Sequence, residues 1–207
     1  MAYGGDKHVR RHANYTSGTP LNVDRILDSQ VFLPWIGGKY DEGGLSGKRL
    51  LVVGESHYGS GAVSADRGFT RDIISRYVAG KGGRTTVFYT KAARLLLRDR
   101  DADREARRDL WNRISFYNYV QSGQLKARGG IPANWSDYFS QLDGVIRALE
   151  PNLVLLLSKR LWSKLERRLA AEEFPFDVDC HGFCHPSGRF RYDTEIPKVE
   201  AVLGTVR

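Results

Sequence analysis

Three short apolar runs, separated by segments with helical periodicity, constrain the fold of this chain more than any other feature. Residues 49–53 are Arg-Leu-Leu-Val-Val, residues 113–117 are Arg-Ile-Ser-Phe-Tyr, and residues 153–157 are Leu-Val-Leu-Leu-Leu. Residues 176–180 form a fourth, weaker run. Nearly continuous apolar character over four to eight residues is typical of strands buried on both faces of a parallel sheet.

The segments between these runs predict helices. We expect helices at residues 70–78, 86–97, 135–149 and 159–171, and in the last of them leucines repeat every four residues. Strands that alternate with helices favour an α/β fold, here a three-layer α/β/α sandwich with a short, mainly parallel four-stranded sheet. A chain of 207 residues predicts one domain, which we place at 21–207, after a flexible basic N-terminal arm at 1–20.

The charge balance indicates a polyanionic partner. The chain has 32 Lys and Arg against 24 Asp and Glu, so its formal net charge is +8, which attracts nucleic acid. No window approaches the ~20 apolar residues of a membrane span, and residues 1–20 lack the apolar core of a secretion signal. Two cysteines do not make a disulfide framework. We therefore expect a cytoplasmic protein with no membrane partner, and nucleic acid is the first partner to consider.

Two Cys-His pairs near the C-terminus raise the question of zinc. Cys180, His181, Cys184 and His185 offer four possible ligands within six residues. Structural zinc sites usually take ligand pairs from two separate segments, and this spacing lets only some of the four side chains converge. We therefore expect no metal and no other cofactor.

Seven arginines lie between residues 94 and 113, but five acidic residues are interleaved with them. Asp103 and Arg107 stand at the i,i+4 spacing of a helical ion pair. This pattern favours a solvated helix face over a dedicated DNA-binding surface.

Polar segments stand where the predicted strands end. Gly-Glu-Ser-His-Tyr at 54–58 follows the run at 49–53, Asn118 follows the run at 113–117, and His-Pro-Ser at 185–187 comes near the C-terminus. Ligands of open α/β sheets bind outside the carboxyl ends of the strands. The sequence therefore predicts that these segments form one site.

The order strand, Gly-Glu-Ser-His-Tyr, strand-Asn and His-Pro-Ser resembles the uracil-DNA glycosylase superfamily over residues 49–192. The resemblance implies an enzyme, expected to be a monomer, that flips a base out of single- or double-stranded DNA and hydrolyses its N-glycosidic bond, leaving an abasic site. It implies that Tyr58 walls off the C5 edge of a pyrimidine, Phe69 stacks on the flipped base, Asn118 binds the base edge and His185 supports negative charge on the departing base. It also implies a loop pressed onto the DNA that contains Ser187, Arg189 and Phe190.

Two residues of the first motif depart from the family. Ser56 stands where several branches have a water-positioning Asp or Asn, and serine supplies no negative charge. Glu55, one residue earlier, is the replacement we expect as water activator or stabiliser of the sugar cation, with Asp66 and Asp193 as more distant candidates. The predicted catalytic residues are therefore Glu55, Ser56 and His185. His57 stands where one branch has Pro. An altered pocket floor predicts either uracil or a modified pyrimidine as substrate, such as a hypermodified cytosine in phage DNA, and a role in repair or in defence.

Other functions remain open at this stage. A serine hydrolase would use Ser56 and His185 with an acid such as Asp193, although the Gly-x-Ser-x-Gly elbow and the order Ser, Asp, His are not matched. A catalytically silent protein of the same fold would bind nucleic acid without cleaving it. Within the glycosylases we expect a monofunctional enzyme, because the lysines nearest the motifs in sequence, Lys48 and Lys81, show no mark of a Schiff-base nucleophile.

Overall fold

The structure, a computed structural model, describes residues 30–57, 66–81, 86–122, 134–172, 174, 176–188 and 190–204. The predicted N-terminal arm, 1–20, lies outside these ranges. The strands are β1 (Trp35–Ile36), β2 (Leu50–Gly54), β3 (Ser115–Asn118), β4 (Leu153–Leu156) and β5 (Asp179–Gly182). The helices are α2 (Phe69–Val78), α3 (Val87–Leu97), α4 (Arg104–Arg113), the 3₁₀ turn η2 (Trp135–Tyr138), α5 (Phe139–Leu149), α6 (Lys159–Ala171) and α7 (Tyr192–Leu203).

The sheet has the strand order β1-β3-β2-β4-β5, in which β3, β2, β4 and β5 are parallel and β1 is antiparallel to β3. The predicted α/β fold is confirmed, but the sheet has five strands rather than four. The additional strand, β1, has two residues, which are too few to show any periodicity in the sequence. It extends the sheet at the β3 edge.

Two predicted strands are shifted along the chain. The run at 113–117 begins in α4, which ends at Arg113, so that β3 starts at Ser115. The run at 176–180 is replaced by Asp179–Gly182. β5 is an edge strand with half-buried residues, and its Asp-Cys-His-Gly sequence lacks the apolar pattern of a central strand.

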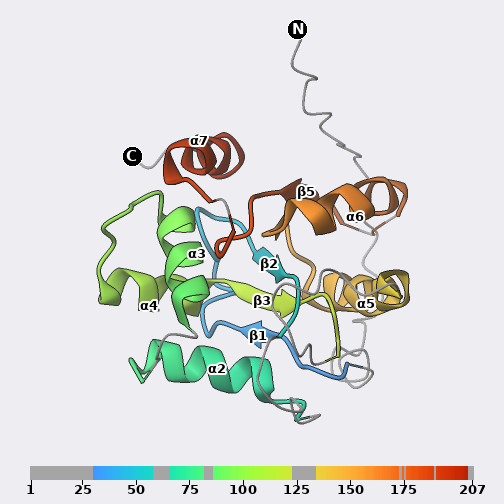
Figure 1. Ribbon diagram of the computed structural model, residues 1–207, viewed down its shortest axis with the longest axis horizontal. Helices are drawn as coiled ribbons and strands as arrows, with labels where there is room; N and C mark the ends of the chain where they lie inside the picture. The colour runs from blue at the N-terminus through green and yellow to red at the C-terminus, as the bar shows by residue number, and fades with distance from the viewer. Residues whose placement is uncertain are drawn as a thin grey trace, which may run out of the picture.

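Helices cover both faces of the sheet (Figure 1). Leu50 and Val52 of β2 pack with residues of α2, α3, α4 and α7, whereas Leu51 and Val53 pack with residues of α5 and α6. Burial on both faces explains why this strand is apolar at every position. The sheet is the middle layer of an α/β/α sandwich.

Side chains cap two of these helices. The Asp103 carboxylate accepts a hydrogen bond from Ala106 N at the start of α4, and Ser158 Oγ accepts one from Leu161 N at the start of α6. Asp103 is thus used as a cap, and no ion pair joins it to Arg107 in the part of the chain that the structure describes, contrary to the i,i+4 pairing predicted from the sequence. None of the helices described is both long enough and apolar enough to cross a membrane.

Candidate active site

The site lies where β2 and β3 end side by side (Figure 1). Gly54 and Asn118 are partners in the parallel register, and Asn118 is buried. A Cβ atom at Gly54 would collide with Asn118 Oδ1 and lie 2.9 Å from the Phe116 ring. Glycine at position 54 therefore makes the space that the Asn118 amide occupies, at the carboxyl edge where ligands of such sheets bind.

Glu55 is a buried carboxylate held by the start of α6. Arg160 donates from Nη2 to Oε2 at 2.7 Å and from Nε to Oε1 at 3.2 Å, and the Ser158 hydroxyl donates to Oε1. Burial by itself raises the pKa of Glu55, but the hydrogen bonds from Arg160 and Ser158 and the Arg160 charge outweigh it, so that the pKa lies below its ordinary value. Glu55 is therefore ionised at neutral pH and is a weak proton acceptor.

His185 is oriented by its own loop. Ser187 N donates to His185 Nδ1 at 3.1 Å, and the ring lies 5.3 Å from the Phe88 ring of α3 between centroids. Burial lowers the pKa of His185 below its ordinary value, with Glu55 raising it and Arg160 lowering it further. Because Nδ1 accepts a hydrogen bond, the neutral ring has its proton on Nε2. The imidazole is thus a fixed N–H donor.

Glu55 and His185 belong to one site. Each changes the pKa of the other through its charge, although 130 positions separate them in the sequence. The two side chains therefore lie near enough for the charge of one to change the pKa of the other.

Asn118 is anchored through His57. In the sequence, His57 stood out only as a departure from the family pattern. The Asn118 Nδ2 atom lies 3.2 Å from both ring nitrogens of His57, and His57 Nε2 lies 2.8 Å from Thr70 Oγ1 on α2. Burial lowers the pKa of His57 to about 4, so the ring is neutral. The Phe69 ring meets it edge to face at 4.8 Å. Two predicted base-binding residues, Asn118 and Phe69, therefore come together around His57.

The backbone after β3 is also fixed. Val120 N donates to Glu55 O at 2.8 Å, and Gln121 Nε2 donates to Asn118 O at 2.6 Å. Gln121 in turn accepts a hydrogen bond from Phe32 N at 2.7 Å. These bonds hold the segments that follow β2 and β3 against one another, so the side chains at the strand ends are held in place before any ligand binds.

Other predicted site residues lack side-chain contacts that would support their predicted roles, or lie outside the described residues. Ser56 is half-buried, and its hydroxyl makes no hydrogen bond to any residue in the described ranges. Ser187 contributes its backbone N–H, and its side chain is exposed. Phe190 is half-buried, with its ring centroid 4.9 Å from that of Tyr192 and its side chain packed against the core beside α7, and its role as a DNA wedge stays a prediction. Tyr58 and Arg189 lie outside the described residues.

Three contributors were missed from the sequence. Ser158 and Arg160 follow β4 directly, so the strand-end rule that selected Glu55 and Asn118 also applied to them. Lys91 on α3 donates from Nζ to Pro186 O at 3.1 Å. Lys91 is distant in sequence from the site motifs and reaches the His185 loop only through the fold, so neighbours in sequence did not reveal it.

The cysteine–histidine cluster does not assemble a metal centre in the ranges described. No group of three or more His, Cys, Asp or Glu side chains there is placed to hold a metal ion, and Cys180 and Cys184 are both free thiols. Burial raises the pKa of the Cys180 thiol to about 12, so this sulfur is not a thiolate at neutral pH.

The chain matches no model of a known protein family, and no curated protein gives a significant match. Its function is therefore inferred from the geometry of the site.

Proposed function

We propose that this protein is a monofunctional DNA glycosylase that hydrolyses the N-glycosidic bond of a flipped-out uracil or modified pyrimidine. The observation that supports this best is that an ionised, buried carboxylate at the end of β2, Glu55, lies near enough to a neutral imidazole N–H donor, His185, for each to change the pKa of the other. The two groups match the two charges that develop when a base leaves its sugar. Water is the nucleophile, and the products are a free base and an abasic site.

The bond-breaking step separates charge. The base leaves with the electron pair of the N-glycosidic bond, and an oxocarbenium-like sugar remains. His185 Nε2–H donates to the oxygen of the departing base, and the Glu55 carboxylate stabilises the cation and orients water toward C1′. The water oxygen then bonds to C1′ and its proton ends on the base. A preorganised donor of this kind contributes roughly 10²- to 10³-fold to the rate.

The low pKa of Glu55 selects between its two predicted roles. A carboxylate already bonded to Arg160 and Ser158 takes a proton from water poorly. It supplies negative charge near the sugar without needing to be protonated. We therefore assign Glu55 to cation stabilisation and water orientation, with proton release following bond cleavage.

Base recognition is assigned to Asn118 and Phe69. Extruding a base costs a few kcal/mol of unstacking, and stacking on an aromatic ring returns about 1 to 3 kcal/mol per base. Phe69 is half-buried beside His57, and the Asn118 amide is immobilised above Gly54. The small Ser56 side chain next to Glu55 supports a substrate larger than uracil, such as a modified cytosine of phage DNA.

A catalytically silent DNA-binding protein is the second candidate. It is favoured by the contacts of Glu55, because Arg160 and Ser158 already compensate its charge. A serine hydrolase is disfavoured, since Asp193 pairs with Arg100 at 3.3 Å and with Arg191 at 3.6 Å on the surface, and His185 Nδ1 is oriented by a backbone N–H.

Alkali-revealed strand cleavage tests the proposal. Single- and double-stranded oligonucleotides would contain uracil, hypoxanthine, 5-hydroxymethylcytosine or glucosylated hydroxymethylcytosine, and wild type would be compared with His185→Ala. Cleavage at one base that His185→Ala abolishes supports the glycosylase and identifies its substrate. Retained DNA binding with no cleavage at any base would favour the silent binding protein.

Lys91 makes the monofunctional assignment testable in the same reactions. A lysine acting as nucleophile would form a Schiff base with the sugar, which borohydride reduces to a stable protein–DNA complex. We expect no trapped complex with wild type. A complex that forms with wild type and disappears in Lys91→Gln would replace water by Lys91 as the nucleophile.

A further inference from the structure

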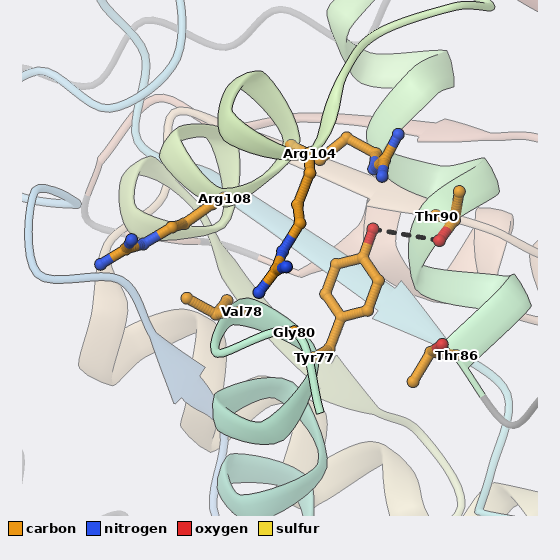
Figure 2. A pocket seen from close by; sticks show the side chains of 8 residues that line it. Tyr77, Val78, Gly80, Thr86, Thr90, Arg104 and Arg108 are labelled. Atoms are coloured by element: carbon orange, nitrogen blue, oxygen red, sulfur yellow. Dashed lines mark hydrogen bonds between the residues drawn. The ribbon is translucent and has the colours of Figure 1, made fainter. Parts of the chain in front are cut away.

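A second charged hollow lies away from the candidate active site, between α2, α3 and α4 (Figure 2). Its cavity volume is about 200 Å³, and its lining residues are Tyr77, Val78, Gly80, Thr86, Thr90, Arg104, Arg107 and Arg108. Thr86 and Thr90 lie one helical turn apart at the start of α3, whereas Phe88, midway between them, faces His185 instead. The helix therefore separates this arginine pocket from the candidate active site.

Uncharged backbone groups hold the arginine side chains of the arginine pocket in place. Arg104 donates from Nη2 to Ala79 O at 2.9 Å, and its guanidinium covers Gly80 so closely that a Cβ atom there would collide with it. Arg107 donates from Nη1 to Ala102 O, and its Nε is buried without a hydrogen-bond partner. Among the described residues no carboxylate lines the pocket, and neither arginine makes an ion pair there.

Hydroxyl donors complete the lining. Tyr77 Oη and Thr90 Oγ1 lie 3.1 Å apart, and Figure 2 shows the Tyr77 hydroxyl pointing at Thr90 beside the Arg104 side chain. Whichever hydroxyl accepts this hydrogen bond keeps its own O–H to donate. The Tyr77 ring is fixed by edge contacts with Trp111 at 6.3 Å. The pocket therefore presents oriented N–H and O–H donors with net positive charge.

We propose that the arginine pocket is a binding site for a phosphate group. Guanidinium groups bind phosphate oxygens through charge-assisted hydrogen bonds, and a tyrosine or threonine hydroxyl adds a further donor. A cavity of about 200 Å³ is smaller than the ~300 to 1,000 Å³ of drug-sized sites, so it takes the phosphate and leaves the rest of the molecule outside. The phosphate belongs to the backbone of a nucleic acid or to a small phosphorylated molecule.

Matched charge variants test this assignment. Arg104→Gln and Arg107→Gln each remove one pocket charge, while Arg100→Gln removes the same charge from an exposed arginine that pairs with Asp193. Tyr77→Phe removes one hydroxyl and keeps the ring in its aromatic cluster, so it reports on the pocket even where an arginine variant unfolds. Thermal unfolding establishes which variants are folded.

Two binding measurements distinguish the sources of phosphate. The first is fluorescence anisotropy with an oligonucleotide of ordinary bases at several salt concentrations, and the second is calorimetry with inorganic phosphate and thymidine 5′-monophosphate. A nucleic-acid backbone predicts roughly 3- to 10-fold weaker DNA binding in Arg104→Gln and Arg107→Gln, with a shallower salt dependence, and little change in Arg100→Gln. Because the DNA has no modified base, the result does not depend on glycosylase activity.

A small phosphorylated ligand predicts the opposite pattern. Phosphate or the nucleotide would bind wild type, the pocket variants including Tyr77→Phe would lose that binding, and DNA affinity would be unchanged. If neither DNA nor the small phosphates distinguished the folded pocket variants from Arg100→Gln, the proposal would be overturned.

Discussion

The candidate active site and the arginine pocket differ in whether their charged side chains have partners of opposite charge. At the strand ends the buried Glu55 carboxylate is paired with Arg160, and burial keeps His185 neutral. In the arginine pocket, backbone carbonyls orient Arg104 and Arg107 and leave their charge uncompensated in the ranges described. Where the charges of a buried site are paired, the protonation state of each group is fixed. A catalytic group needs such a defined protonation state. Uncompensated charge in an open hollow attracts an anion. The difference predicts that substitutions in the first region change rates and that substitutions in the second change affinity.

The largest expected effect is on catalysis at Glu55. Glu55→Gln keeps the volume and removes the negative charge that stabilises the sugar cation, so the single-turnover rate on the active substrate should fall roughly 10²- to 10³-fold. Glu150→Gln, on a half-exposed acid that pairs with Arg49, is the matched control and should leave the rate unchanged. A Glu55→Gln rate within threefold of wild type would contradict the assigned role and remove the contrast between the two regions.

The next effect is on acid stability through His57. Its pKa is about 4 in the folded protein against an ordinary value of 6.5, so between these values the unfolded chain binds the extra proton. The free energy of unfolding should therefore have its highest value above pH 6.5, where His57 is neutral in both states. It should fall by about 3 kcal/mol as the pH drops to 4. Urea unfolding at several pH values measures this slope.

His57→Gln is the comparison for that slope, because a glutamine does not titrate. Its free energy of unfolding should change less between pH 6.5 and 4 than that of wild type. An equal slope in the two proteins would show that His57 is not buried as a neutral ring, and the anchoring of Asn118 would need another explanation.

A glycine pair tests the packing of the strand ends. Gly54→Ala places a methyl group against Asn118 and Phe116 and should cost about 1 to 3 kcal/mol of stability, or displace the Asn118 amide and lower activity. Gly38→Ala meets nothing within 4 Å and should be nearly neutral. Thermal unfolding of both variants checks this, and equal melting temperatures for the two would contradict the packing described.

The smallest expected effect is a shift in the pH–rate profile. Arg160→Gln removes the charge and a bidentate partner that lower the pKa of Glu55. The pKa should rise, so the acid limb of the profile should move to higher pH, while the rate at its plateau should fall less than in Glu55→Gln. An acid limb that stays in place would show that another group controls it.

The fold could be predicted wherever burial produced a recognisable pattern of apolar residues in the sequence. β2 and β4 are apolar at almost every position because helices cover both faces, and the runs at 49–53 and 153–157 located them to within one residue. β1 has two residues and β5 is a polar edge strand, so their existence depends on neighbours that the sequence does not reveal.

The site was predictable at strand ends and not across helices. Glu55 and Asn118 follow apolar runs, whereas His185 was selected because its His-Pro-Ser segment resembles that of the uracil-DNA glycosylase superfamily. The Asn118–His57–Thr70 contacts join residues from two strand ends and a helix, and Lys91 reaches the His185 loop from α3. The arginine pocket was missed because acids alternate with its arginines in sequence, although one of those acids caps the helix and leaves Arg107 without a carboxylate partner.

The most direct test of the glycosylase is to quantify the two products in one reaction. Mass spectrometry would measure free base, and an aldehyde-reactive probe would count abasic sites, for wild type, Glu55→Gln and His185→Ala on the substrate found in the oligonucleotide panel. We predict equal amounts of free base and abasic site with wild type, and a loss of both in the two variants at a temperature where each variant is folded and still binds DNA. DNA that is bound by wild type with no base released from any substrate, or release that survives in both variants, would contradict the account.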